Sequence, residues 1–484
     1  MSLFQKLFKQ TTIYGLATVL PRMLSFFLVR LYTDQLQDTA DYGMLTIAFS
    51  WIVFMNVVLS YGMETTFFRF FNTESDKQKV KQTSMTMLLC SSIFFLIVAT
   101  LFKGSIADLV GIPKEYLFII IGILFFDALV IIPFANIRLK EQPIRYAVIK
   151  VANTILNLVL NLFFLLVLPK LANDTDSVFN QIYIPNFEVG YIFIANLIAS
   201  LFTFTYFLPE YFKIKLIVDK GLVKPMLVYA LPILVAGIAF AINEHFDKIL
   251  LEKLLPEVIA KQEVGIYAAC YKLGLFMVLF TTAFRLGIEP FLFSYAKNEN
   301  AQQTYALIMK CFVILGCIIL LGVIVFVDVL KQIMINQSYW DAIKIVPLII
   351  MANLFLGIYN NLSIWYKLTN KTMYGAYISI FGAVITLVLN FALIPKYSYV
   401  GSAWATLMAY FSMMLVSYWI GRKYYRIPYQ LNKIVFYLLV STILSLIYFY
   451  LFRDNYAIGI AFIVLFCMMI YFSEKQMIRS ILKK

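Results

Sequence analysis

The sequence predicts an all-α polytopic membrane protein with about 14 transmembrane helices. Its 484 residues are 62% hydrophobic and only 14% charged, with a mean hydropathy of +0.84, whereas soluble domains are about 45–50% apolar and about 25% charged. The apolar runs are continuous over about 20 residues and do not alternate, which favours helices over a membrane β-barrel. Because only these two architectures satisfy the backbone polar groups in lipid, a helical bundle is expected.

Fourteen apolar runs, separated by charged residues or by Pro, Gly and Asn, each predict one span. An even number of spans returns both termini to the same side of the membrane. The predicted spans cover residues 11–33, 42–69, 82–102, 115–137, 146–168, 189–208, 225–250, 264–295, 305–327, 345–366, 374–394, 400–420, 434–452 and 456–472.

The distribution of Lys and Arg predicts the orientation. The segments on the side of the N-terminus hold 23 of these residues and the opposite loops hold 9. Because cytoplasmic loops carry the excess of positive charge, both termini are predicted to be cytoplasmic. This rule explains the net charge of +14 without a nucleic-acid partner. The other eight basic residues lie inside the predicted spans: Arg22, Arg30, Arg69, Lys150, Lys248, Lys272, Arg285 and Lys310.

An internal repeat relates residues 138–161 to residues 367–390, with seven of 24 positions identical. Matching landmarks flank it in the same order: Gly43 with Gly265, Gly62-Met63-Glu64 with Gly287-Ile288-Glu289, and Val189-Gly190 with Val400-Gly401. A repeat of six spans predicts two six-helix lobes related by an axis along the membrane normal. The lobes are expected at residues 1–224 and 225–430, with two accessory helices in 431–484.

Two segments carry a resemblance to a known family. The first runs from Tyr14-Gly15 through Pro21-Arg22 to Asp41-Tyr42-Gly43, and the second from Leu231-Pro232 through Asp247-Lys248-Ile249-Leu250-Leu251 to Val264-Gly265-Ile266-Tyr267-Ala268-Ala269. With the span count and the repeat, the chain resembles the multidrug/oligosaccharidyl-lipid/polysaccharide (MOP) exporter superfamily. Within it, the chain is most similar to the polysaccharide-biosynthesis flippases of the Wzx type, which serve O-antigen and capsule synthesis.

The resemblance implies a flippase of a bacterial inner membrane that moves undecaprenyl-diphosphate-linked oligosaccharide to the periplasmic leaflet by alternating access. It also implies coupling to H⁺ or Na⁺, contact with membrane lipids, and association with a glycan polymerase or glycosyltransferase complex. A lipid II flippase and a multidrug exporter are the alternatives within the superfamily, although clustered Arg and Lys suit cationic drugs poorly. A scaffold protein whose charges serve only packing is the alternative outside transport.

Enzyme and cofactor motifs are absent from the sequence. It contains no Walker A string, no His-Glu-x-x-His and a single histidine. The five cysteines fall inside apolar runs without a Cys-x-x-Cys pair, which predicts neither a disulfide framework nor a zinc site. The predicted loops are too short to hold a sugar donor and acceptor. We therefore expect a transporter without a cofactor, and not an enzyme.

Arg22 and Arg30 in the first predicted span are candidate substrate-binding residues. Arg suits a diphosphate because its planar fork makes bidentate, charge-assisted hydrogen bonds. Charges inside the bilayer are costly and usually face a cavity or each other. The alternative for Arg30 is an ion pair with Asp34 at the outer interface.

The fifth predicted span carries a polar stripe of Lys150, Asn153, Asn157 and Asn161 at three- and four-residue spacing. Such a stripe lines a sugar-binding cavity or forms hydrogen bonds with neighbouring helices, and the sequence does not decide between the two.

Lys272 and Arg285 in the eighth predicted span are further candidates for binding phosphate. Arg285 either contacts substrate or pairs with Glu289 on its own helix, four residues later. Glu64 is the repeat equivalent of Glu289, and both glutamates are candidate gate residues.

Asp127 lies alone in the fourth predicted span, which suggests either a proton-coupling site or a structural pair with Lys150. Glu244, His245, Asp247 and Lys248 cluster at the outer end of the seventh span, where Glu244 and Lys248 are spaced for a salt bridge. Asp247 is a candidate for ion coupling or gating. One histidine among scattered carboxylates does not specify a metal.

Overall fold

The computed structural model describes residues 3–173, 177–296 and 298–475, and these form helices and connecting turns without a strand. Twelve helical stretches in this part are long and apolar enough to cross a membrane. One of them, Met373–Tyr424, is broken at Ser398 and contains two of the predicted spans, and helix Leu3–Gln35 contains the first. All fourteen predicted spans therefore lie on helices.

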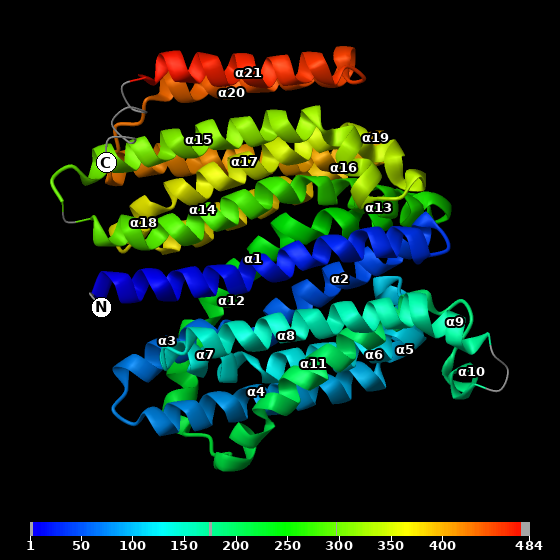
Figure 1. The fold of residues 1–484 in the computed structure, drawn as a ribbon. Helices are drawn as coiled ribbons and strands as arrows, with labels where there is room; N and C mark the ends of the chain where they lie inside the picture. Colours follow the sequence, from blue (N-terminus) through cyan, green and yellow to red (C-terminus); the bar gives the residue numbers. More distant parts are fainter. Residues whose placement is uncertain (1–2, 174–176, 297, 476–484) are drawn as a thin grey trace.

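The long helices run roughly parallel in two groups, and α1 of the first group and α12 of the second lie near the boundary between them (Figure 1). The first group, the N lobe, comprises α1 (Leu3–Gln35), α2 (Thr39–Ser60), α3 (Met63–Thr73), α4 (Lys77–Leu101), α5 (Lys103–Val110), α6 (Lys114–Leu129), α7 (Ile131–Leu139), α8 (Pro143–Leu162), the π-helical turn η1 (Phe163–Val167), α9 (Leu168–Ala172), α10 (Val178–Ile182) and α11 (Glu188–Lys213).

The second group, the C lobe, is followed by an accessory pair. The C lobe comprises α12 (Lys220–Leu254), α13 (Glu257–Tyr271), the 3₁₀ turn η2 (Lys272–Gly274), α14 (Leu275–Ser294), α15 (Ala301–Val325), α16 (Val327–Met334), the 3₁₀ segment η3 (Gln337–Ile345), α17 (Val346–Leu362), α18 (Ile364–Leu368) and α19 (Met373–Tyr424). The accessory pair comprises α20 (Leu431–Ile447), the π-helical turn η4 (Tyr448–Phe452) and α21 (Tyr456–Ser473).

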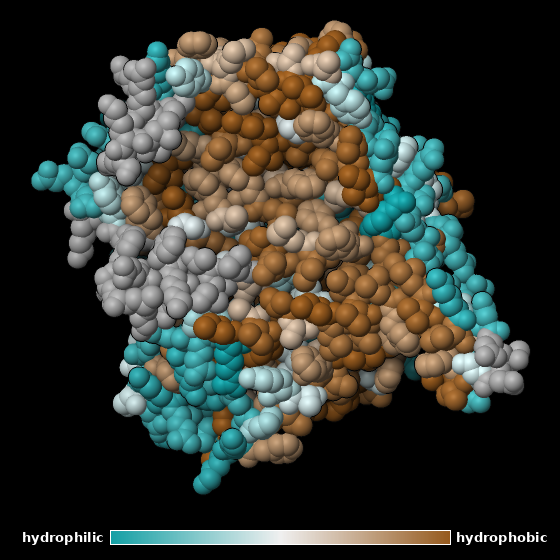
Figure 2. All heavy atoms as spheres, viewed as in Figure 1, coloured by the Kyte–Doolittle hydropathy of each residue, from teal (hydrophilic) through white to brown (hydrophobic). Residues whose placement is uncertain are grey.

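The surface has the polarity expected of a membrane protein. Hydrophobic side chains cover the middle of the molecule and hydrophilic ones gather at both ends (Figure 2). We call the end at which α1 begins the N-face and the other end the far face. The last described helix, α21, ends on the N-face (Figure 1). The predicted cytoplasmic termini include residues 1–2 and 476–484, which lie outside the described residues.

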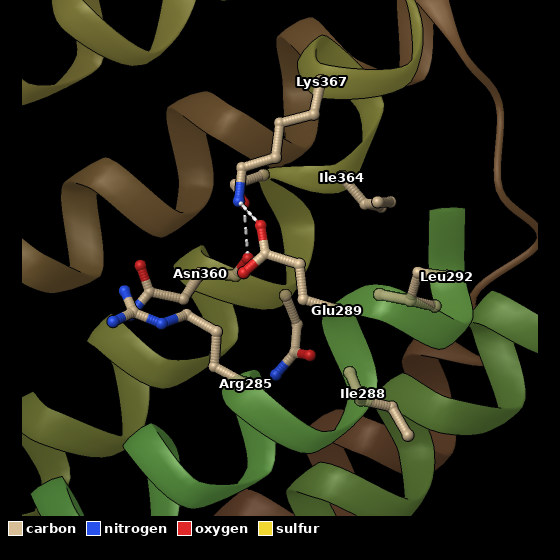
Figure 3. A pocket seen from close by; sticks show the side chains of 9 residues that line it. Arg285, Ile288, Glu289, Leu292, Asn360, Ile364 and Lys367 are labelled. Carbon is tan, nitrogen blue, oxygen red and sulfur yellow. Dashed lines mark hydrogen bonds and ion pairs between the residues drawn. The ribbon is translucent and has the colours of Figure 1, made fainter. Parts of the chain in front are cut away.

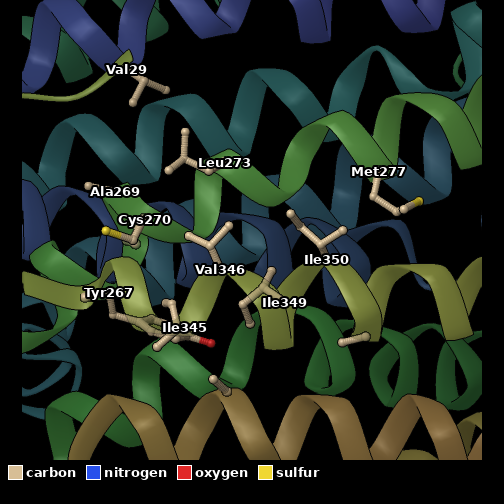
Figure 4. Close-up of a cluster of buried hydrophobic side chains, with 14 of the residues drawn as sticks. Val29, Tyr267, Ala269, Cys270, Leu273, Met277, Ile345, Val346, Ile349 and Ile350 are labelled. Atoms are coloured by element: carbon tan, nitrogen blue, oxygen red, sulfur yellow. The ribbon is translucent and has the colours of Figure 1, made fainter. Parts of the chain in front are cut away.

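One continuous hydrophobic core joins the two lobes. Val29 of α1 belongs to the same buried cluster as Cys270, Leu273 and Ile349 of the C lobe (Figure 4). Because this apolar core crosses the lobe boundary, the lobes are in close contact in this conformation.

The repeat-equivalent glycines Gly43 and Gly265 face each other where α2 meets α13. A Cβ atom at Gly43 would lie 1.8 Å from the carbonyl oxygen of Lys261, and one at Gly265 would lie 1.9 Å from that of Thr39. The two backbones therefore touch near the far face, and only glycine permits this approach.

The accessory pair is attached to the C lobe at both faces. On the N-face, Glu474 forms ion pairs with Lys310 of α15 at 2.7 Å and with Lys433 of α20 at 2.8 Å. On the far face, Arg453 pairs with Asp328 of α16 at 2.7 Å. These links at opposite ends hold the accessory helices against one lobe only.

Candidate substrate-binding site

Helices α1, α12 and α14 bring charged side chains together where the lobes meet. The Arg22 guanidinium is accessible and donates one hydrogen bond to Thr282 Oγ1 at 2.9 Å. Arg285 lies three residues after Thr282 on α14, is also accessible, and makes no hydrogen bond or ion pair with any residue that the structure describes. Glu244 of α12 interacts electrostatically with both arginines. Two arginines thus present guanidinium groups that the protein itself satisfies only in small part.

Arg285 also lines a small polar pocket on the N-face side of the C lobe. In Figure 3 the Arg285 side chain lies beside Asn360, while Glu289 points toward Lys367. The pocket is lined by Arg285, Ile288, Glu289, Leu292, Asn360, Asn361, Ser363, Ile364 and Lys367. Amides and a guanidinium together offer hydrogen-bond donors to hydroxyl and anionic groups.

Glu289 does not form the intrahelical pair with Arg285 that its spacing allowed. It pairs instead with Lys367 of α18, at 2.5 Å, because that ammonium lies across the pocket within reach of its carboxylate. In the N lobe, Glu64 forms the same kind of ion pair with Arg138 of α7. The repeat thus places a glutamate–base pair at the N-face end of each lobe, which leaves Arg285 free.

Lys272 occupies the first position of η2, the 3₁₀ turn that separates α13 from α14. Its ammonium makes no hydrogen bond or ion pair with the described residues, although it lies close enough to His245 and Lys248 to interact with both electrostatically. A cation without a counter-ion between helices is costly in a membrane protein. An anionic ligand would remove that cost.

The cluster at the outer end of the seventh span forms a different network from the predicted one. Lys248 pairs with Asp247, at 2.7 Å. Its ammonium contacts Glu244 through that residue's backbone oxygen, at 3.3 Å, and not through its carboxylate. The predicted Glu244–Lys248 salt bridge is therefore wrong, because the buried Asp247 carboxylate is nearer. Tyr267 donates a second hydrogen bond to Asp247, at 2.7 Å. Asp247 is buried and fully partnered in this conformation.

The asparagine stripe of α8 packs against neighbouring helices. Asn153 Nδ2 donates to Thr203 Oγ1 of α11 at 2.9 Å. Asn161 receives a hydrogen bond from Tyr32 of α1 at 3.1 Å and donates to the Asn157 side chain at 3.0 Å. The contacts of Asn153 with α11 and of Asn161 with α1 match the interhelical alternative that the sequence left open, whereas the bond to Asn157 lies within α8.

Asp127 and Lys150 are near each other but do not form an ion pair. The Asp127 carboxylate accepts hydrogen bonds from Ser200, at 2.7 Å, and Asn56, at 3.4 Å. The Lys150 ammonium lies over the Phe134 ring, 4.4 Å from its centroid. Neutral donors from α2 and α11 thus satisfy the carboxylate, and the two charges interact only at longer range.

Arg30 lies apart from the other candidate cations, at the far-face end of α1. Its guanidinium pairs with Asp34 at 2.6 Å, as the alternative interpretation of its spacing predicted. It also reaches across to the C lobe, to the carbonyl groups of Gln332 and Ile335.

Sequence reasoning did not identify Asn243, which connects α12 with α19. It donates to the Ser379 carbonyl at 3.0 Å and accepts from Thr386 at 2.9 Å. The available sequence signal was its position directly before the charged run that begins at Glu244. In the structure it faces the repeat counterpart of the α8 stripe. Among the residues described, no group of three or more His, Cys, Asp or Glu side chains could hold a metal ion.

A bundle of two six-helix lobes, with cations at their boundary that form no ion pair with a described residue, defines a multi-pass helical membrane protein. The family model for polysaccharide biosynthesis proteins matches residues 7–277, more than half of the chain. The chain therefore belongs to the polysaccharide biosynthesis protein family, and the predicted family is confirmed. No curated protein sequence matches the chain significantly.

Solved transporters share the fold. The lipid II flippase MurJ, in an inward closed conformation, matches with a TM-score of 0.75 over 96% of this chain and 99% of that chain, at 16% identity. A multidrug resistance MATE family transporter of the MOP superfamily, facing inward, gives 0.61 over 85% and 94%, at 14% identity. A MATE transporter from Vibrio cholerae gives 0.59 over 87% and 97%, at 17% identity. At these identities the likeness establishes the fold.

Proposed function

We propose that this protein is a flippase that carries undecaprenyl-diphosphate-linked oligosaccharide from the cytoplasmic to the periplasmic leaflet of a bacterial inner membrane. The family membership and the fold support transport of a lipid-linked substrate. The observation that carries the proposal is the set of three cations, Arg22, Lys272 and Arg285, none of which forms an ion pair with a residue that the structure describes. A diphosphate supplies the missing negative charge and accepts several charge-assisted hydrogen bonds.

In the proposed mechanism the N-face is cytoplasmic, in agreement with the loop charges. The diphosphate binds the three cations, the sugars extend toward the polar pocket beside Asn360, and the prenyl chain stays in lipid. Movement of residues 1–224 against residues 225–430 then exposes the head group on the far face, with the accessory helices of 431–484 following the C lobe.

Ion coupling is part of the same proposal. Asp127 is partly buried and Asp247 is buried, and each accepts at least one hydrogen bond from a neighbouring helix. A change in their ionisation or ion binding would therefore alter helix packing. Glu64 and Glu289 hold basic partners at the N-face and are suited to gating on that side. Either H⁺ or Na⁺ fits this chemistry. Comparing transport under an H⁺ gradient with transport under a Na⁺ gradient distinguishes the two ions.

The test is transport by purified protein in vesicles. A fluorescent undecaprenyl-diphosphate oligosaccharide is placed in the inner leaflet, and its arrival outside is followed under an H⁺ or a Na⁺ gradient. Arg22→Ala and Lys272→Ala should each slow translocation by about 10-fold or more, the effect of removing a charged hydrogen bond. Arg69→Ala is the matched control, because Arg69 is a basic residue on a predicted span that already stacks on a ring of the protein, 4.1 Å from the Tyr229 centroid.

Three outcomes contradict the proposal in different ways. Normal transport by the Arg22→Ala/Lys272→Ala double variant would show that these cations do not form the substrate-binding site. Faster transport of lipid II than of the oligosaccharide assigns the protein to the alternative substrate. No transport of either lipid by the unmodified chain leaves the scaffold alternative in place.

A further inference from the structure

The far face is closed by a strip of hydrogen bonds between the lobes, and Arg30 lies at its centre. Arg30 Nη1 donates to the carbonyl oxygens of Gln332, at 3.0 Å, and Ile335, at 2.9 Å. These carbonyls lie at the C-terminal end of α16, where backbone oxygens lack helical partners and the helix dipole is negative. A guanidinium on the N lobe thus caps a helix of the C lobe.

Asn336, directly after this helix end, is held by the same part of α1. Its backbone N–H donates to Thr33 Oγ1 at 3.2 Å, and its side-chain amide donates to Asp34 Oδ1 at 2.8 Å. Further along, the Tyr339 hydroxyl donates to the Asp38 carbonyl at 3.3 Å. The end of α1 and the turn into α2 therefore bind residues 332–339 through side chains and backbone alike.

The strip covers a buried layer of the lobe interface. Cys270 has no solvent-accessible surface, and its Sγ lies 3.2 Å from the Tyr339 carbonyl oxygen. The glycine contact of α2 with α13 lies in the same region, since Tyr42 is next to Gly43 and its ring packs on Tyr339 at 5.6 Å. A path through the far face would have to separate these groups.

We propose that Arg30, with Asp34 and Asn336, forms a latch that keeps the far face closed, and that the far face opens when Arg30 leaves the carbonyls of α16. The position of this step in a transport cycle rests on the proposed function, whereas the closure itself does not. Asp34 lies on the same helix as Arg30 and pairs with it at 2.6 Å. The arginine therefore keeps its counter-ion when the latch opens, and no unpaired charge is created.

Cys270 supplies a native reporter of the latch. The full-length chain is prepared with the other four cysteines changed to alanine, and the rate at which a charged maleimide labels Cys270 is measured in detergent. Arg30→Ala should raise this rate by about five-fold, the factor expected when a net hydrogen bond is lost from the closed state. Arg30→Lys keeps the charge without the forked geometry and should give an intermediate rate.

Matched variants separate the latch from general loosening. Arg69→Ala, on the opposite face, should label at the unmodified rate. The pair Asp34→Cys and Asn336→Cys, made with Cys270 changed to alanine, should form a disulfide under mild oxidation and block translocation until it is reduced.

Unchanged labelling in Arg30→Ala, or equal acceleration by Arg69→Ala, overturns the latch. Labelling needs no substrate, so it is independent of the transport assay. Faster labelling in a chain that moves neither lipid would refute the proposed function and leave the latch standing. Transport by the unmodified chain together with unchanged labelling in Arg30→Ala would support the proposed function and refute the latch.

Discussion

The two lobes are alike at their ends and different at their centre. Each has a glutamate paired with a base at the N-face, Glu64 with Arg138 and Glu289 with Lys367. At the centre, the C lobe has Lys272 seven residues after Gly265, where the N lobe has Ser50 seven residues after Gly43. Arg285 two residues before Gly287 likewise corresponds to Ser60 two residues before Gly62. The repeat preserved the scaffold, whereas Lys272 and Arg285, two of the three cations that we assign to substrate, are found in the C lobe only.

Making the C lobe resemble the N lobe should have the largest effect. Lys272→Ser and Arg285→Ser should each reduce translocation by about 10-fold or more, because each removes a cation from the proposed diphosphate site. Ser50→Ala and Ser60→Ala, at the matching positions, should transport normally in the same vesicle assay. Equal losses in both lobes would show that the site is symmetric and contradict our assignment.

The accessory helices give a second asymmetry, since they are attached only to the C lobe. Glu474→Gln leaves Lys310 buried without its counter-ion and should destabilise the protein by about 3 kcal/mol, as is typical when one partner of a buried pair is removed. The measurement is the midpoint of thermal unfolding in detergent. Asp219→Asn, at an exposed N-face turn where Asp219 pairs with Lys79 at 3.4 Å, should shift it little.

Acid should weaken the same attachment. Burial acts to raise the pKa of Glu474, but hydrogen bonds from Lys310, Lys433 and Tyr437 outweigh it and hold the pKa below its usual value. A lowered folded-state pKa means that this stabilisation is complete above the unfolded-state pKa and is lost as the pH falls through the folded-state pKa. Unfolding midpoints of the unmodified chain and Glu474→Gln should therefore differ fully near neutrality and begin to converge only as the pH falls below the ordinary glutamate pKa of about 4.3.

Replacing the repeat-equivalent asparagines tests how far the scaffold is symmetric. Asn161 and Asn390 both donate from Nδ2 to the backbone oxygen four residues earlier, at 2.7 Å, and both are fully buried. Their side-chain oxygens accept hydrogen bonds from Tyr32 of α1 and from Ser402, beyond the break in α19. Asn161→Ala and Asn390→Ala should therefore each cost about 0.6–1.7 kcal/mol, from the average to the maximum found for hydrogen bonds between membrane helices. The measurement is the free energy of unfolding in detergent. A loss of stability in only one of the two variants would contradict equal structural roles of the two asparagines.

The smallest expected effect concerns the two N-face ion pairs. Both are partly exposed, so Glu64→Gln and Glu289→Gln should each cost about 0.2–1 kcal/mol. The costs should be similar in the two lobes and should decrease with added salt. A transport defect in only one variant would show that the gates are not equivalent.

The sequence predicted the membrane fold, the span count and the family, because hydropathy and repeats are properties of the chain itself. It offered the Arg30–Asp34 pair as an alternative, which the structure contains, but it did not predict the other pairs of charges. The i, i+4 spacing suggested Arg285 with Glu289 and Glu244 with Lys248, but the observed partners are Lys367 and Asp247. Contacts between helices depend on their rotation and depth, which spacing along one helix does not contain.

One clue to these contacts was available and needed a different use of the repeat. The glutamates at 64 and 289 match, and so do the bases at 138 and 367. Opposite charges that occur together in both copies indicate that they interact. Gly43 and Gly265 likewise served as landmarks of the repeat, and the sequence did not indicate that they touch each other.

The backbone contact between Gly43 and Gly265 also affects how quickly the lobes can separate. Helices that meet through glycine have no interlocking side chains at that point, so they can part without a change of rotamer. At this contact the resistance to opening would come from the hydrogen bonds around Arg30, whereas the buried core that joins the lobes would have to repack elsewhere. Arg30, at the end of the first helix, would thereby contribute directly to the rate at which the far face opens.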